Sequence, residues 1–131
     1  MATPTEIFHR LLTGITEGRF TELADLYAED AVVELPFARP APVRLVGREA
    51  LRAHFDAPLP DGFKLVASDV VVRTTDDPEV VVAEWNYTVN GNGPLANVQI
   101  MRVRDGLIVA TRDFHDHAGL ASLASPAASA G

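Results

Sequence analysis

The sequence predicts an α+β fold in one domain, because segments with helical periodicity come first and strand-like segments separated by turn signals come last. The chain has 131 residues, of which 47% are hydrophobic and 22% are charged. This is enough apolar material for one packed core and too little chain for two. We expect the domain to span residues 1–120 and the Ala- and Ser-rich residues 121–131 to form a flexible tail.

The first part of the chain predicts helices. Apolar residues recur at steps of three and four between Pro4 and Ala28, which is typical of an amphipathic helix. Gly18 is expected to divide this segment into two helices, and Thr21 is expected to cap the second. A short strand, an extended segment and a third helix are then predicted over Ala31–Leu35, Val43–Val46 and Arg48–Phe55.

The second half of the chain contains four β-rich segments that are separated by short turn sequences at residues 76–78, 90–94 and 105–106. Turns of this length leave no room for crossover helices. Neighbouring strands should therefore pair antiparallel, and we expect no parallel crossover in the sheet. The predicted strands are Lys64–Thr75, Val80–Asn90, Leu95–Arg104 and Leu107–His115.

Charge and composition limit the possible functions. Eighteen acidic and eleven basic residues give a net charge of -7, which disfavours nucleic-acid binding. The absence of cysteine excludes disulfides, thiolate nucleophiles and thiolate zinc sites. No apolar run approaches the roughly 20 residues of a membrane span, and the N-terminus does not resemble a signal peptide. We therefore expect a cytoplasmic protein that binds neither nucleic acid nor membrane, and we expect no cofactor and no metal.

Three stretches carry a resemblance to a known family: LADLYAEDAVVELP, LVGREALRAHF and VRDGLIVATRDFHDHAGLA. They resemble the SnoaL-like branch of the nuclear transport factor 2-like superfamily, which includes polyketide cyclases, ketosteroid isomerases and limonene-epoxide hydrolases. The resemblance spans about residues 6–120. It implies a cone-like curved antiparallel sheet, a cystatin-like roll, with three helices packed on its concave face and a pocket between them. Because one fold hosts many chemistries, the function has to be argued from the pocket.

Strand alternation predicts which side chains face that pocket. On the strand Leu95–Arg104, Gln99 and Met101 are expected to point inward because Arg102 is most easily solvated on the outer face. The same logic places Trp85 and Tyr87 inward on the preceding strand. Both aromatic residues carry a polar tip that requires a partner when buried, which suits a wall that holds an oxygenated ligand.

The last predicted strand leaves two possibilities open. Either Asp113 and His115 face inward, or Arg112 and Phe114 do, and periodicity does not decide between them. The family resemblance favours the first set, because the aspartate of the Arg-Asp-aromatic motif points into the cavity in cyclase-like and hydrolase-like members. This choice requires an extra, bulged residue after the turn at residues 105–106.

Asp113 is the main candidate for a catalytic residue. A carboxyl buried among apolar side chains should have a raised pKa, so that it can exchange protons near neutral pH. The alternative interpretation is a structural ion pair. His115 follows on the same face and is a candidate helper, or else a structural histidine. Successive inward side chains lie roughly 6–7 Å apart, which is too far for Asp113, His115 and His117 to hold one metal.

Other positions depart from the family pattern. The general base of the steroid isomerases would fall at Leu35 and their helix-borne tyrosine at Leu11, and neither side chain can move a proton. Gln99 stands where isomerases have a protonated acid, and an amide cannot titrate. The Arg-x-Asp sequence of the epoxide hydrolases is absent from the third long strand. The steroid isomerase and epoxide hydrolase mechanisms are therefore not expected.

These observations predict a cofactor-independent cyclase or isomerase of secondary metabolism that acts by acid/base catalysis on a polyketide-like or cyclic ketone substrate. The alternative is a non-catalytic ligand-binding or accessory dimeric protein. We expect a homodimer through the outer sheet face, because the valine runs at 70–72 and 80–82 place apolar side chains on both faces. His9 and His54 are expected on the surface. The ligand, a small apolar or oxygenated molecule, is expected to contact Gln99, Tyr87, Trp85, Met101, Leu35, Phe37 and Phe55.

Overall fold

The computed structural model describes residues 2–116, 118–119 and 122. His117 and the predicted tail, apart from position 122, lie outside the described residues. Within this part of the chain, no helix combines the length and the apolar character needed to cross a membrane. The helices are α1 (Pro4–Thr16), the 3-10 helix η1 (Phe20–Leu26) and α2 (Arg48–Phe55), and the strands are β1 (Tyr27–Leu35), β2 (Val43–Val46), β3 (Leu65–Thr74), β4 (Val80–Val89), β5 (Asn92–Arg104) and β6 (Leu107–His115).

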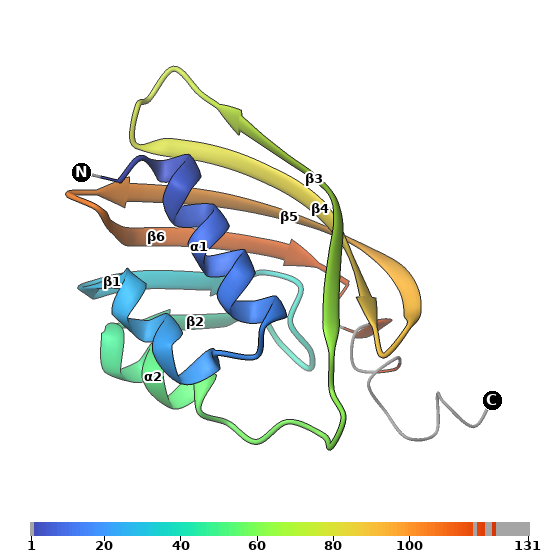
Figure 1. Cartoon of the computed structure of the whole chain (residues 1–131). Helices are drawn as coiled ribbons and strands as arrows, with labels where there is room; N and C mark the ends of the chain where they lie inside the picture. The colour runs from blue at the N-terminus through green and yellow to red at the C-terminus, as the bar shows by residue number, and fades with distance from the viewer. Residues whose placement is uncertain (1, 117, 120–121, 123–131) are drawn as a thin grey trace.

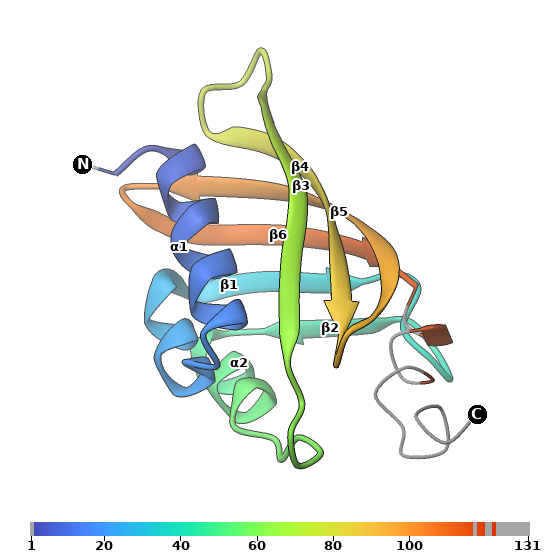
Figure 2. The same ribbon diagram turned by 45° about the vertical axis from the view of Figure 1, so that its right-hand side comes forward.

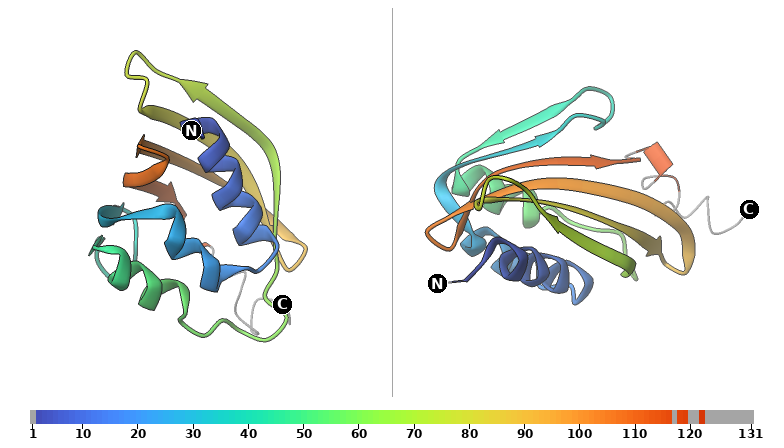
Figure 3. Two further views of the ribbon diagram at one scale, coloured as in Figure 1. Left: turned by 60° about the vertical axis from the view of Figure 1, so that its left-hand side comes forward. Right: turned by 90° about the horizontal axis from the view of Figure 1, so that it is seen from above.

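The six strands form one curved sheet in the order β2-β1-β6-β5-β4-β3. The helices α1, η1 and α2 lie together on its concave side (Figure 1), and the view from above shows the helix layer and the sheet as separate layers (Figure 3). Figure 2 shows that the sheet bends, so that β3 runs at a steep angle to β1 and β2. The predicted α+β class, with three helices on a cone-like sheet, is confirmed.

One part of the topology differs from the prediction. The strands β3 to β6 pair in sequence and antiparallel, as expected from their short turns. However, β1 pairs with β6 in parallel, for example through Val33 and Thr111, so the expectation of a sheet without a parallel crossover was wrong. Turn lengths constrain only strands that are neighbours in the sequence. They carry no information about how the first strand meets the last.

The N-terminal helices follow the sequence signals with one exception. Thr3 and Glu6 form a capping box at the start of α1, and Gly18, with a φ of 73°, stands at the predicted break between the two helices. Thr21 does not cap η1, because η1 already begins at Phe20 and has Arg19 at its N-cap position. The third helix has the predicted bounds.

The core lies between α1 and the sheet. The buried face of α1 includes Ile7, Phe8, Leu11 and Leu12, and α1 packs against β3, β4 and β5. The ring of Phe8 meets that of Trp85 edge to face, with 5.2 Å between their centroids. This contact fixes the distance between the helix and the part of the sheet that carries the polar side chains discussed below.

A β-bulge near the start of β6 determines which side chains face the core. The extra residue is Val109, which lies between the pairs Val103–Ile108 and Arg102–Ala110. The bulge required by the sequence analysis is therefore present. It reverses the alternation before it, so that Ile108 and not Leu107 is buried. After the bulge, Thr111 and Asp113 lie on the inner face, as expected.

Candidate functional site

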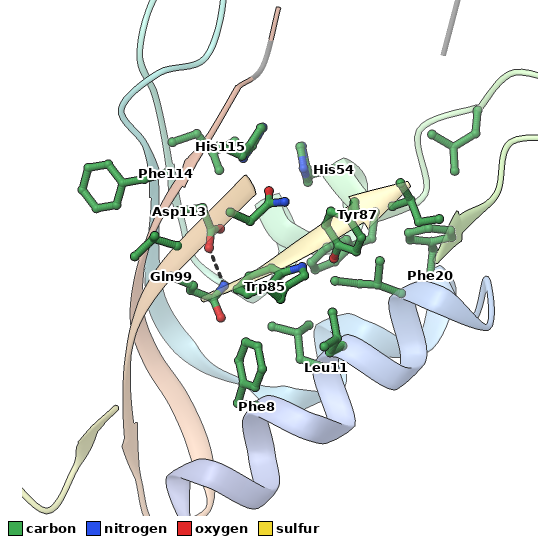
Figure 4. Close-up of a pocket in the computed structure, with 18 of the residues that line it drawn as sticks. Phe8, Leu11, Phe20, His54, Trp85, Tyr87, Gln99, Asp113, Phe114 and His115 are labelled. Atoms are coloured by element: carbon green, nitrogen blue, oxygen red, sulfur yellow. Dashed lines mark hydrogen bonds between the residues drawn. The ribbon is translucent and has the colours of Figure 1, made fainter. Parts of the chain in front are cut away.

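A cavity of about 410 Å³ opens between the helices and the concave face of the sheet (Figure 4). Most of its wall is apolar and comes from α1, η1 and the loop that follows α2, through residues such as Leu11, Phe20 and Phe63. No arginine or lysine belongs to the described wall. The polar or titratable side chains of the wall are those of His54, Trp85, Tyr87, Asn97, Gln99, Asp113 and His115.

Four of these side chains form two rows across β5 and β6. Gln99 lies opposite Asp113, and Asn97 lies opposite His115. Side chains opposite each other in such a pair have Cβ atoms roughly 5 Å apart, and successive rows lie roughly 6–7 Å apart along the strands. Gln99 Nε2 donates a hydrogen bond to Asp113 Oδ1, drawn as a dashed line in Figure 4. The arrangement gives the apolar cavity one polar wall.

The surroundings of Asp113 make its carboxyl titrate near neutrality. Burial in the apolar wall raises the pKa of Asp113 to about 7, and the hydrogen bond from Gln99 opposes this increase by favouring the charged form. The described wall contains no arginine or lysine that would lower the pKa further. At pH 7 the carboxyl is therefore present in both forms, which is the condition for a group that both accepts and donates protons.

The tyrosines near Asp113 stay neutral. Burial raises the pKa of Tyr87 above its usual value, and the charge of Asp113 adds to the increase. The pKa of the buried Tyr27 is raised for the same reasons of burial and charge. Both phenols therefore remain hydrogen-bond donors at neutral pH. In the described structure, two buried atoms of the wall, Trp85 Nε1 and Gln99 Oε1, make no hydrogen bond.

Seven of the predicted site residues line this one cavity: Asp113, His115, Gln99, Tyr87, Trp85, Leu35 and Phe55. Two do not. Phe37 is 60% exposed and packs edge to face on Phe114, whose side chain points away from the cavity in Figure 4. Met101 is fully buried in the core and is not part of the cavity wall.

The two corrections have different physical reasons. Phe37 follows the end of β1, where the chain turns and strand alternation no longer applies. Met101 is on the inner face, as predicted. Strand alternation predicts the face of the sheet on which a side chain lies, but it does not predict whether neighbouring side chains cover that side chain and separate it from the cavity. His54 was expected on the surface; it is exposed and also lines the cavity from the last turn of α2.

Solved structures share the fold at low sequence identity. A Bacillus subtilis protein provisionally named an isomerase is 24% identical, with a TM-score of 0.72 and coverage of 85% of this chain and 84% of that chain. A Xanthomonas campestris protein provisionally named a polyketide cyclase is 20% identical, with a TM-score of 0.72 and coverage of 93% and 96%. A phenazine biosynthesis-related protein from Pseudomonas aeruginosa is 17% identical, with a TM-score of 0.65 and coverage of 90% and 82%.

At these identities the structural likeness is evidence for the fold alone. No curated protein is similar enough in sequence to count as a match. The model of the SnoaL-like domain matches residues 8–111, which include the helices and strands that surround the cavity except the start of α1 and the end of β6. The chain therefore belongs to the SnoaL-like domain family.

Proposed function

We propose that the protein is a cofactor-independent isomerase or cyclase in which Asp113 moves protons on a small cyclic ketone or polyketide-like substrate. One observation carries this proposal: a carboxyl with a pKa of about 7 lies in the wall of a largely apolar cavity. Such a carboxyl is a stronger base than an exposed one and is still ionised in a substantial fraction of molecules at neutral pH.

The proposed reaction passes through an enolate. The Asp113 carboxylate takes a proton from a carbon next to the ketone carbonyl, so that the C–H bond breaks, an O–H bond forms and the electron pair moves to the carbonyl oxygen. The neutral hydroxyl of Tyr87 and the unused N–H of Trp85 supply donors for that oxygen. Return of a proton to a different carbon gives the isomer, whereas attack of the enolate on a second carbonyl gives a ring.

The composition of the wall supports an uncharged ligand. Its only carboxyl in the described residues is that of Asp113, and no guanidinium or ammonium group is present to bind a carboxylate or a phosphate. Apolar contacts with residues such as Phe8, Leu12 and Phe55 would hold the hydrocarbon part. The polar wall would then receive the oxygen atoms.

Conversion of cyclohex-3-enone to cyclohex-2-enone tests the proposal, because this small ketone needs only the removal and return of a proton and its product absorbs in the ultraviolet. We expect the wild-type rate to rise between pH 5 and about pH 7, because the carboxylate of Asp113 is the active base. Asp76→Asn, which changes an exposed carboxylate in the β3–β4 turn, should leave the profile unchanged. Absence of conversion, or a rate that does not respond to pH between 5 and 9, would contradict the proposal.

A second candidate function is ligand binding without catalysis. It is favoured by Gln99, whose amide cannot act as the second acid/base group that such reactions often use. Trp85 is the only tryptophan of the chain, so its fluorescence reports on the cavity. Saturable quenching by the bicyclic ketone 2-tetralone, together with no conversion of cyclohex-3-enone, would favour this second function.

We also propose a homodimer that forms through the outer face of the sheet. Val82 and Ile100 pair on that face, and Val66 and Val71 are 48% and 41% exposed there. The valine runs at 70–72 and 80–82, which predict the dimer, place only some of their side chains on this outer face, because Val81 faces the core. An exposed apolar patch of this kind is typical of an interface.

Ile100→Glu tests the dimer, because it places a charge in the middle of this face. We expect light scattering at micromolar concentration to give a dimeric mass for the wild type and a monomeric mass for the variant. Asp76→Asn should remain dimeric. A monomeric wild type would contradict the proposal.

A further inference from the structure

The reaction proposed above moves a proton twice, once away from the substrate and once back to it. Asp113 is the only carboxyl in the described wall, and the raised pKa of Tyr87 keeps that phenol neutral. The remaining side chains of the described wall that can carry a proton are the imidazoles of His54 and His115. His115 is on the same strand and face as Asp113, whereas His54 comes from a different wall.

His54 stands at the boundary between the cavity and solvent. It belongs to the last turn of α2, and its ring packs edge to face on that of Phe55 with 5.6 Å between centroids. The residue is exposed, yet it lines the same cavity as Asp113. In Figure 4 the side chains of His54, from α2, and His115, from β6, are both drawn at the end of the cavity that is away from α1. A side chain in this place is within reach of both bulk water and a ligand in the cavity.

Several charged groups lie on α2 and on the elements that pack against it. On α2 itself, Arg52 forms ion pairs with Glu49 and, on η1, with Asp25. Asp56 follows α2 directly, and Arg48 is bound to the backbone carbonyl of Tyr27 on β1. The other titratable groups of the same cavity wall are Asp113 and His115 of β6 and Tyr87 of β4.

We propose that His54 is a second proton-transfer residue of this site, which delivers solvent protons to the intermediate that Asp113 creates. This inference rests on the proposed function. The imidazolium N–H bond breaks, a C–H bond forms at the new carbon, and the electron pair of the enolate becomes that bond. Asp113 is then protonated and His54 is neutral. The cycle closes when Asp113 loses its proton to water and His54 takes one from water.

The two possible routes differ in the origin of the returned proton. If Asp113 acts alone, it carries the proton from C2 of cyclohex-3-enone to C4, and the product made in D2O keeps protium at C4 except where the Asp113 proton exchanges with solvent, which happens equally with and without His54. If His54 delivers the second proton, that proton comes from solvent and the product carries deuterium at C4. The isotope at C4 therefore reports the route independently of the rate.

The experiment compares the wild type with His54→Gln and with His9→Gln during early conversion in D2O, read by NMR of the product. His9 is a matched control, because it is also exposed on a helix but does not line the cavity. We expect deuterium at C4 with the wild type and His9→Gln, and at least a twofold smaller fraction with His54→Gln. Melting curves of the three proteins should coincide.

Equal deuterium fractions in His54→Gln and the wild type would overturn the inference and leave the proposed function intact. Failure of the wild type to convert the ketone, or full conversion by Asp113→Asn, would overturn the proposed function and the inference with it. Loss of conversion in His54→Gln with a normal melting curve would place the residue in the proton-transfer machinery and support the inference.

Discussion

Asp113→Asn is expected to be more stable than the wild type at pH 8 and to convert cyclohex-3-enone at least about 100-fold more slowly. The activity is lost because an amide cannot accept the substrate proton, and general acid/base catalysis contributes roughly 10²–10⁴-fold. The stability is gained because the wild type must keep a charged carboxylate in an apolar wall at this pH. Asparagine has nearly the same shape and carries no charge.

The sign and the pH range of the stability effect follow from the pKa of Asp113. Its value of about 7 in the folded protein compares with about 3.9 in an unfolded chain, so folding favours the protonated form. The contribution of the group to stability is complete below about pH 4 and is lost as the pH rises to about 7. The loss amounts to at most about 4 kcal/mol. The two proteins should therefore differ little at pH 4 and most above pH 7.

Urea unfolding of both proteins between pH 4 and pH 8 measures this difference. Other carboxylates act in the opposite direction. The backbone N–H of Glu79 and the side chain of Arg102 lower the pKa of Asp77, and Arg104 and Arg102 lower the pKa of Glu79, so that protonation of these two groups in acid weakens the fold. Comparison at each pH removes their contribution. A variant that is less stable than the wild type at pH 8 would show that Asp113 is a structural residue, and ligand binding without catalysis would then be the better proposal.

Phe8→Ala is expected to lower the free energy of unfolding by about 3–5 kcal/mol. Phe8 is 1% exposed, and its loss would remove the edge-to-face contact with Trp85 and enlarge the cavity. Phe37→Ala is the matched control, because Phe37 makes the same kind of contact with Phe114 but is 60% exposed. Its cost should stay below about 1 kcal/mol. Similar effects of the two substitutions in urea unfolding would contradict this view of the core.

The same pair of residues shows what the sequence could and could not predict. Both Phe8 and Phe37 are large and apolar, so composition alone would place either of them in the interior. Periodicity places Phe8 on the buried stripe of α1, and this was correct. Phe37 lies in a proline-rich loop, where no periodic pattern exists and where only the three-dimensional course of the chain decides the exposure.

The inner face of the sheet was predictable for a different reason. Alternation alone placed Trp85, Tyr87 and Gln99 correctly, because β4 and the relevant part of β5 run without interruption. On β6 the family resemblance was needed, since Val109 interrupts the alternation. His54 could not be found by either route, because a residue at the mouth of a cavity is both exposed and part of its wall.

The place of β6 in the sheet also determines when the protein can fold during its synthesis. Although β6 is the last strand to be made, it lies between β1, which is made first, and β5. Until residues 107–115 have left the ribosome, the nascent chain holds two separate groups of strands, each with an open edge that can pair with other chains. Joining them requires contacts between opposite ends of the domain, which form slowly. The strand that brings Asp113 into the cavity is thus also the one whose arrival ends the period in which the new chain is most prone to aggregate.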